Sequence, residues 1–420
     1  MRVLFAHTNY PAQFGAFGEW LARQGAEVAF LTQREGASHA EMRVRVCADH
    51  RAPAETTHPY VRGFEKSVIT GQAFARAAIA LGKEGFRPDV MMAHSGWGAG
   101  PFLKDVFPAA AYVPYFEWHY NYPNADRTRG DERPRDPVDA RARNRARNAP
   151  FWMDFSAADA ALCPTRFQAA QFPPWLRRFL TVVHDGVDTD TMRPSGGDRG
   201  ILARWGAPAD AEVVTSITRG MEPHRGFPET MRAIARLQKE RPKLHAFIGG
   251  EDRVCYGAKL PEGDSWKRRM LAELDLDHDR LHFTGLLSRG DMVALMGASD
   301  AHLYLTVPFV LSWSLLDAMS VGCLIVASDT APVREFLSDG ETGLLVPMHD
   351  PEALAARIAE ALDGAARLAP LRAAARAKVV ATLDARRVIW PAKKAWLEKL
   401  VAARRAAMDG AGARAASAAA

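Results

Sequence analysis

The sequence has no run of about 18 apolar residues, so it contains no segment suited to spanning a membrane. Its first residues, MRVLFAHTNYPAQF, lack the cationic start and the cleavage site of a signal peptide. Cysteine is scarce: Cys47, Cys163, Cys255 and Cys323 stand singly, without a CxxC pair, which supports neither a disulfide framework nor a zinc site. We therefore expect a cytoplasmic protein whose cysteines are small core residues.

A strong excess of one charge is also absent. The 54 Lys and Arg residues exceed the 49 Asp and Glu residues only slightly, for a net charge of +5. This excess permits weak attraction to phosphates or to an anionic membrane surface. No RNA- or DNA-binding motif accompanies it, so we expect no nucleic-acid partner. Arginine is densest from Asn124 to Pro150, where a solvated loop leading into a helix is expected.

The sequence does contain a regular alternation of strand-like and helix-like segments. Short apolar runs alternate with helix-period segments through most of the 420 residues, which is typical of βαβ units with parallel sheets. The first half predicts strands at residues 2–7, 27–32, 89–95, 110–116, 160–165 and 181–186. After the Gly- and Asp-rich linker DGVDTDTMRPSGGDRG, further strands are predicted at residues 213–218, 244–250, 281–285, 301–306 and 324–329. The pattern predicts an α/β protein with two open parallel sheets, one in residues 1–190 and one in residues 191–385.

The C-terminal part of the chain is predicted to be helical. Residues 353–383 are Ala-rich, with an interruption expected near Pro370. Residues 386–409 predict an amphipathic helix that carries aromatic side chains. The low-complexity residues 410–420 are expected to be disordered.

Two strand-to-helix turns of the second half carry candidate chemistry, because open parallel sheets bind ligands at the carboxyl ends of their strands. In SITRGMEPHRGFPETM, Arg219 and Arg225 precede a helix. Guanidinium groups and free backbone N–H groups at a helix start both favour phosphate oxygens, so this turn is a candidate diphosphate site. The alternative is a surface loop whose arginines pair with nearby acids such as Glu222.

The second turn is FVLSWSLLDAM, Phe309 to Met319. Pro308 ends the preceding strand and Ser312 is a candidate N-cap, so the free N–H groups from about Val310 to Trp313 could hold phosphate oxygens. Asp317, about one turn farther on, is suited to vicinal hydroxyls. Its alternative role is that of an acid on the helix surface.

These turns belong to segments that, in sequence and order, resemble the retaining glycosyltransferases of family 4, which have the GT-B architecture. The segments are HFTGLLSRGDMVALMGASDAHLYLT, LLDAMSVGCLIVASDTAPVREFLSDGETGLLV, VVHDGVDTDTMRP and TRGMEPHRGF, and the resemblance extends from Met1 to about Leu362. It implies two Rossmann-like domains facing each other across a cleft and a nucleotide sugar bound by the second. It also implies a final helix that crosses back to the first domain.

The resemblance also assigns residues. Arg219 and Arg225 fall on the basic pair that binds the donor diphosphate, although they are six positions apart where five is commoner. Asp317 falls on the second acid of the Glu-x7-Glu motif, which holds the ribose hydroxyls. The first acid, which contacts hydroxyls of the transferred sugar, is replaced by Phe309. The implied donor-binding residues are Gly15, Gly285, Leu286, Phe309, Val310, Leu311, Ser312, Asp317 and Glu335.

The acceptor side is placed in the first domain. The family has a His at the end of a strand there, and the equivalent segment YVPYFEWHYNY offers Glu117 and His119 as catalytic candidates, with Glu117 nearest the family position. His94, in MMAHSGWGAG, matches the turn one strand earlier. Trp118 and Tyr120 are suited to lining an acceptor groove or stacking on a sugar ring.

The resulting hypothesis is transfer of a hexosyl unit from a UDP- or GDP-sugar, with retention, to a glycan, lipid or small-molecule acceptor, as in cell-envelope glycan or glycolipid synthesis. No cofactor and no metal are expected, because the site turns lack an Asp-x-Asp cluster. A weak peripheral contact with an anionic membrane could come from Arg141 to Arg147 and the C-terminal helix. The alternatives are a non-catalytic sugar-nucleotide-binding or scaffolding protein, and an epimerase or phosphorylase of the same architecture.

Overall fold

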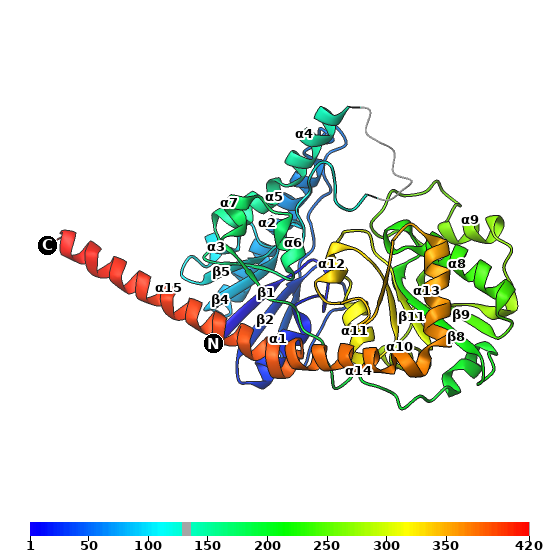
Figure 1. Cartoon of the computed structure of the whole chain (residues 1–420). Coiled ribbons are helices and arrows are strands. Elements are labelled where there is room, and N and C mark those ends of the chain that lie inside the picture. Colours follow the sequence, from blue (N-terminus) through cyan, green and yellow to red (C-terminus); the bar gives the residue numbers. More distant parts are fainter. Residues whose placement is uncertain (128–135, 420) are drawn as a thin grey trace. The chain divides into compact units, whose positions relative to one another are not determined.

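The computed structural model describes residues 1–127 and 136–419, with side chains described as far as Gly410. The chain divides into two compact units (Figure 1). The N-terminal unit contains Met1–Pro123, residues 136–185 and the segment that begins at Arg386. The C-terminal unit contains Gly186–Ala385 and the described residues 124–127. Each unit contains one parallel sheet and its covering helices, as the alternating pattern predicts.

The N-terminal unit has a seven-stranded sheet in the order β3-β2-β1-β4-β5-β6-β7. Its strands are β1 (Arg2–Ala6), β2 (Glu27–Thr32), β3 (Arg43–Val46), β4 (Val90–His94), β5 (Ala111–Tyr115), β6 (Ala161–Cys163) and β7 (Leu180–Val182). Its helices are α1 (Gly15–Arg23), α2 (Arg62–Lys83), α3 (Leu103–Val106), α4 (Pro137–Arg147), α5 (Ala149–Ser156), α6 (Arg166–Ala170), α7 (Pro174–Arg177) and α15 (Trp390–Ala419). The edge strand β3, RVRV, was not predicted because it alternates charged and apolar residues and has no apolar run.

Both faces of this sheet are covered. Leu4 belongs to the core cluster that contains Phe74 and Leu81 of α2. Phe5, the next residue of β1, points to the opposite face, because side chains alternate along a strand. There its ring packs on Phe14 and on Phe17 of α1, with ring centroids 5.4 and 6.0 Å apart.

The C-terminal unit has a six-stranded sheet in the order β10-β9-β8-β11-β12-β13. Its strands are β8 (Glu212–Gly220), β9 (Leu244–Glu251), β10 (Leu281–Gly285), β11 (Ala301–Tyr304), β12 (Ile325–Ser328) and β13 (Leu344–Val346). Its α-helices are α8 (Phe227–Glu240), α9 (Trp266–Glu273), α10 (Arg289–Gly297), α11 (Trp313–Val321), α12 (Ala331–Arg334), α13 (Pro351–Asp363) and α14 (Ala365–Thr382). Short 3-10 helices are η1 (Gly200–Trp205), η2 (Pro223–Arg225) and η3 (His278–Arg280).

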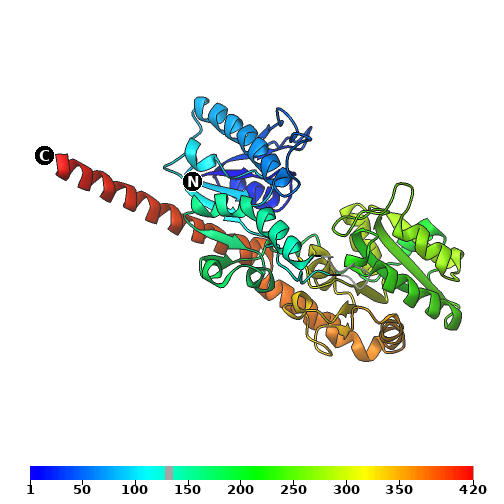
Figure 2. The same cartoon turned by 90° about the horizontal axis from the view of Figure 1, so that it is seen from above.

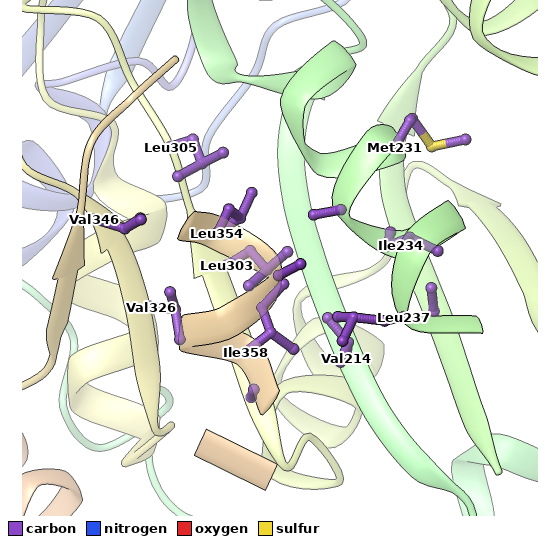
Figure 3. Close-up of a cluster of buried hydrophobic side chains, with 14 of the residues drawn as sticks. Val214, Met231, Ile234, Leu237, Leu303, Leu305, Val326, Val346, Leu354 and Ile358 are labelled. Atoms are coloured by element: carbon purple, nitrogen blue, oxygen red, sulfur yellow. The ribbon is translucent and has the colours of Figure 1, made fainter. Parts of the chain in front are cut away.

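The core of this unit lies between the sheet and two helices, α8 and α13 (Figure 3). From α8 it takes Met231, Ile234 and Leu237, at the spacing that places side chains on one helical face. From the sheet, from the residue after β11 and from α13, the figure labels Val214, Leu303, Leu305, Val326, Val346, Leu354 and Ile358. Packing on this core also explains why α14 continues through Pro370. Leu368 and Leu371 on either side of it are buried in the same cluster, so α14 continues through Pro370 and the predicted interruption lies instead at Gly364, between α13 and α14.

Helix α15 belongs to the N-terminal unit, which confirms the predicted return of the final helix to the first domain. Trp390 packs on Phe17 and Trp20 with ring centroids 6.3 and 6.0 Å apart, and its Nε1 donates to the carbonyl of Asp185 at 3.0 Å. The helix is preceded by a π-helical turn, Ala385–Ile389, and continues to Ala419, past residue 409 where its end was expected. It can be followed as one rod in Figure 2. None of the helices in the described ranges is long and apolar enough to cross a membrane.

Candidate functional site

The candidate donor site lies where the strand order of the C-terminal sheet reverses. All pairs in this sheet are parallel, and β8 and β11 are neighbours although two strands separate them in the sequence. The chain leaves their carboxyl ends in opposite directions, and such a switch point is where open α/β sheets bind ligands. The loop after β8 carries Arg225, and the loop after β11 carries Thr306 and residues 309–312. The structure therefore brings the two predicted turns together.

Arg225 is the best-positioned side chain of this site. It is 4% exposed, at the end of the short helix η2. Its Nη1 donates to the hydroxyl of Thr306 at 2.7 Å, and its Nη2 donates to the carbonyl of Val310 at 3.0 Å. Guanidinium has further N–H donors beyond these two. No carboxylate of the described residues forms an ion pair with Arg225, so its charge is available to an anion.

Glu222 does not neutralise the arginines, which removes the surface-loop alternative in the form expected from the sequence. Its side chain is fully buried and accepts hydrogen bonds from the backbone N–H groups of Cys255, Tyr256 and Gly257 at 2.9 to 3.1 Å. Arg219, at the end of β8, is exposed and forms no ion pair with any residue in the described ranges.

The start of α11 differs in one respect from its prediction. Ser312 is the N-cap, as expected, and its hydroxyl accepts from the backbone N–H of Ser314 at 3.4 Å. However, the backbone N–H of Ser312 donates to the Tyr304 hydroxyl at 2.9 Å. The row of free N–H groups expected from Val310 to Trp313 is therefore interrupted at Ser312, because a buried tyrosine behind the loop occupies that donor. Leu311 is buried beside it.

Asp317 lies one turn into α11 and is half-buried. Burial raises the pKa of its carboxyl from the ordinary 3.8 to about 7; Arg289 lowers this pKa and Asp188 raises it. A carboxyl whose pKa is raised in this way is a recurrent feature of functional sites. The structure thus distinguishes Asp317 from an ordinary solvated acid of a helix surface.

Phe309 stands among aromatic rings and beside the guanidinium of Arg225. Its centroid lies 5.2 Å from that of Tyr256 and 6.1 Å from that of His224. The guanidinium carbon of Arg225 is 5.0 Å from the Tyr256 ring and 5.7 Å from the Phe309 ring, which is cation–π distance. Sequence analysis missed Tyr256 and Thr306. The signal for Tyr256 was a long loop between β9 and α9 in which an aromatic residue precedes Gly257.

The other predicted donor residues lie at the same edge of the sheet. Gly285 ends β10 with φ of +66°, a left-handed conformation that favours glycine. Leu286, which follows it, is 68% exposed. Glu335 follows α12, after the end of β12, and is half-buried. Gly285 and Leu286 therefore follow the edge strand β10, and Glu335 follows β12, which is the neighbour of β11.

A second polar cluster lies at the corresponding switch point of the N-terminal sheet, between β1 and β4. His94, at the end of β4, is 2% exposed, and its Nε2 lies 3.4 Å from Oε2 of Glu117. Gln13 donates to the other carboxylate oxygen of Glu117 at 3.0 Å. His7, at the end of β1, places its ring 4.6 Å from that of His94. Burial lowers the pKa of His7 well below its ordinary value of 6.5, and His94 lowers it further, so His7 is neutral.

This cluster joins the predicted Glu117 and His94 and adds His7 and Gln13, which sequence analysis missed. Residues at the end of β1 were not considered there as a source of polar groups. The edge of a parallel sheet makes them neighbours of residues that follow β4 and β5.

His119, Trp118 and Tyr120 have other surroundings. The ring of His119 lies 5.4 Å from Phe172 and 5.8 Å from Trp152, and its Nδ1 is 3.0 Å from Asn121 Oδ1. Trp118 is buried against Phe167. The Tyr120 ring is covered by the guanidinium of Arg147 at 3.5 Å. The structure thus places His119 and Tyr120 around the Phe151 ring, and Trp118 against Phe167.

Gly15 begins α1, and its backbone N–H donates to the carbonyl of Pro11 at 2.7 Å. A Cβ at Gly15 would lie 2.3 Å from the Cβ of Pro11. The tight loop from β1 to α1 therefore requires a residue without a side chain at this position. No group of three or more His, Cys, Asp or Glu side chains in the described ranges is arranged to hold a metal ion.

Two family models match the chain. The model described as Glycosyl transferase family 4 group matches residues 24–192, and the model described as Glycosyl transferases group 1 matches residues 201–378. The first match falls in the N-terminal half and the second covers the candidate donor site.

Individual proteins that are similar to this chain are also named as glycosyltransferases. A protein named D-inositol 3-phosphate glycosyltransferase from Corynebacterium efficiens is 27% identical over 369 residues, which cover 82% of this chain and 80% of that protein. A protein of the same name from Streptomyces avermitilis is 29% identical over 203 residues, covering 47% of this chain and only 42% of that protein. The chain thus spans less than half the length of some relatives that it matches.

Solved structures show the same fold. Sucrose-phosphate synthase from Thermosynechococcus elongatus superposes with a TM-score of 0.72 at 19% identity, covering 96% of this chain and 99% of that one. Anabaena HepE in complex with UDP and glucose superposes with a TM-score of 0.67 at 17% identity, covering 92% and 96%. The fold is therefore GT-B, as the resemblance implied. With both halves of the chain matched by glycosyltransferase family models, the chain belongs to the glycosyltransferases of family 4, group 1.

Proposed function

We propose that the protein transfers a hexosyl unit from a UDP- or GDP-sugar to a hydroxyl acceptor with retention of configuration and without a metal ion. The observation that carries this proposal is Arg225, a buried guanidinium at the sheet switch point whose described partners are neutral oxygens. A buried charge without a counter-charge is costly. A diphosphate would supply that counter-charge and use the remaining N–H donors of Arg225.

The neighbouring residues support the same substrate. Arg219 is exposed and unpaired among the described residues, so it can reach a second phosphate oxygen. Asp317 has the oxygen atoms to accept hydrogen bonds from vicinal ribose hydroxyls. Gly285 and Leu286 at one flank would contact the base, and Glu335 at the other flank would complete the donor site.

In the reaction, the acceptor oxygen forms a bond with the anomeric carbon while the bond from that carbon to the β-phosphate oxygen breaks. The departing phosphate oxygen takes the acceptor proton on the same face of the sugar, which gives retention. Arg225 and Arg219 stabilise the negative charge that develops on the diphosphate, the role of positioned donors in charge-stabilising catalysis. Glu117, held by Gln13 and close to His94, would hold the acceptor hydroxyl.

The relatives named D-inositol 3-phosphate glycosyltransferase and the HepE complex with UDP and glucose are consistent with a hydroxyl-rich acceptor and a uridine nucleotide donor. The direct test is incubation of the protein with UDP- and GDP-sugars, without and with polyol and glycan acceptors, and measurement of the nucleotide released. We expect slow release without acceptor and faster release with one. Tight binding without any release would favour the non-catalytic sugar-nucleotide-binding alternative, for which Phe309 is the supporting observation.

A peripheral role at the inner face of a membrane, in glycan or glycolipid synthesis, is part of the proposal. Helix α4 carries four arginines, Arg141, Arg143, Arg145 and Arg147. Arg143 pairs with Asp139, and Arg147 covers Tyr120, so the attraction is weak, at about 1 kcal/mol for each free cation. Flotation with anionic but not neutral liposomes would support the contact, and equal flotation with both would remove it.

A further inference from the structure

We infer that Tyr256 and Phe309 form the wall against which the transferred sugar lies, and that Glu222 is the positioning residue that holds Tyr256 there. This inference rests on the proposed function, because it takes Arg225 as the diphosphate ligand. The ligand class is a hexopyranose that presents an apolar C–H face to the two rings and a hydroxyl to Tyr256.

Glu222 fixes the loop after β9 through its backbone. It is fully buried, and three consecutive N–H groups, those of residues 255–257, donate to its two carboxylate oxygens. Hydrogen bonds to an ionised acceptor are about twice as strong as neutral ones. Little space remains around them: a Cβ on Gly257 would lie 3.0 Å from Nδ1 of His224 and 3.5 Å from Oε2 of Glu222. The buried carboxylate therefore determines where the intervening residue, Tyr256, projects its side chain.

The loop is also fixed from the strand side. A Cβ on Gly220, the last residue of β8, would lie 2.6 Å from the carbonyl oxygen of Arg253 and 2.7 Å from Sγ of Cys255. The end of β8 and the loop after β9 thus approach each other more closely than any side chain at Gly220 would allow. Tyr256 is held from both directions although its ring is 41% exposed.

The ring of Tyr256 lies next to the expected position of the sugar. The guanidinium of Arg225 is 5.0 Å from this ring and 5.7 Å from that of Phe309, and the two rings meet at an interplanar angle of 61°. The sugar is bonded directly to the β-phosphate, so a diphosphate bound by Arg225 places the sugar within reach of both rings. The Tyr256 hydroxyl forms no hydrogen bond with any residue in the described part of the chain, which leaves it as a donor and acceptor for a sugar hydroxyl.

The test compares binding of UDP-glucose with binding of UDP, and binding of GDP-glucose with binding of GDP, by isothermal titration calorimetry in the full chain; the nucleotide that binds the wild type is the one used for the variants. We expect the wild type to bind UDP-glucose more tightly than UDP. Tyr256→Phe should weaken UDP-glucose binding about fivefold, the contribution of one ordinary hydrogen bond, and leave UDP binding unchanged. Tyr256→Ala and Phe309→Ala should each weaken it further, and Glu222→Gln should act like Tyr256→Ala. Arg253→Ala is the matched control, because Arg253 lies on the same loop, is exposed and pairs with Glu251.

The outcomes separate the inference from the function on which it rests. If neither UDP nor GDP binds the wild type, the proposed function fails and the inference fails with it. If the nucleotide binds but Tyr256→Ala and Phe309→Ala change nucleotide-sugar and nucleotide binding equally, the inference is wrong and the proposed function stands. Should Glu222→Gln not fold, the exposed Tyr256 still provides the test. Recovery of sugar-dependent binding in Glu222→Asp would identify the carboxylate, and not only its volume, as the positioning element.

Discussion

Nη1 of Arg225 donates to the hydroxyl of Thr306 at 2.7 Å, and this bond joins the loop after β8 to the loop after β11. The two strands are neighbours in the sheet, and their loops diverge at the switch point. A second bond, from Nη2 to the Val310 carbonyl, extends the connection into the turn before α11. The same side chain thus orders the site and supplies its charge.

Replacing Arg225 with Ala should raise the activation free energy by about 3 to 4 kcal/mol, because the variant loses a positioned donor to the developing charge. This corresponds to a decrease in kcat/KM for the nucleotide sugar of roughly 10² to 10³-fold. Arg232→Ala is the control, since Arg232 is a partly exposed arginine of the same unit that pairs with Glu273. Thermal unfolding of both variants shows whether the loss exceeds any change in stability. Turnover near that of the wild type would contradict the role of Arg225.

Asp317 should make stability depend on pH. The pKa of its carboxyl is about 7 when folded and ordinarily 3.8, so between these values the folded protein holds a proton that the unfolded chain has released. The free energy of unfolding should therefore decrease as pH rises from about 4 to 7. In Asp317→Asn this part of the slope should disappear, as measured by urea denaturation at several pH values. A wild type and variant with parallel profiles would show that Asp317 titrates normally.

The same residue should affect donor binding. The ionised carboxylate is the better acceptor for ribose hydroxyls, so nucleotide affinity of the wild type should rise as pH rises through about 7. Asp317→Asn should bind more weakly and lose this dependence, which fluorescence or calorimetric titration at pH 6 and pH 8 would detect. An affinity that stays constant with pH in the wild type would remove Asp317 from the ribose site.

Substitutions at Glu117 and at His119 should have different effects on the kinetics. Glu117→Gln keeps the size of the side chain but removes the charge beside His94, and we expect slower transfer to the acceptor with unchanged release of nucleotide in its absence. His119→Phe should leave the acceptor KM unchanged, because His119 packs among Phe172 and Trp152. Steady-state kinetics with varied acceptor tests both. An acceptor KM that changes only in the His119 variant would reverse the assignment.

Trp390 anchors the returning helix α15. It is 6% exposed, packs on Phe17 and Trp20, and donates to the Asp185 carbonyl. Trp390→Ala should reduce the free energy of unfolding of the N-terminal unit by about 3 to 5 kcal/mol, the usual cost of truncating a buried tryptophan. Trp97→Ala, at a side chain that is 55% exposed, is the matched control. Equal losses in the two variants would show that α15 contributes little to this unit.

Some local features followed directly from the pattern of residues. The buried strands were predictable because their apolar runs are bounded by turn residues, as in EVAFLT and AHLYLT. Strands β3 and β13 could not be predicted, because RVRV is polar and LLV is short. Both form by pairing with a neighbouring strand. Ser312 was recognisable as an N-cap from its side chain alone. The hydrogen bond from the Ser312 N–H to the Tyr304 hydroxyl could not be predicted, because the two residues meet only through the fold of the loop.

The two parallel α/β sheets, the family and the loops that would carry the site could be predicted from the amino-acid sequence, since periodicity and turn chemistry are local properties. The contacts between side chains became visible only in the folded chain: Glu222 binds the amides of the loop after β9 instead of Arg225, Tyr256 contacts Phe309, and His94 and His7 lie near Glu117 while His119 does not. These contacts join residues after different strands. The strand order and the direction of each side chain at the sheet edge create them, and neither is written in the local pattern of residues.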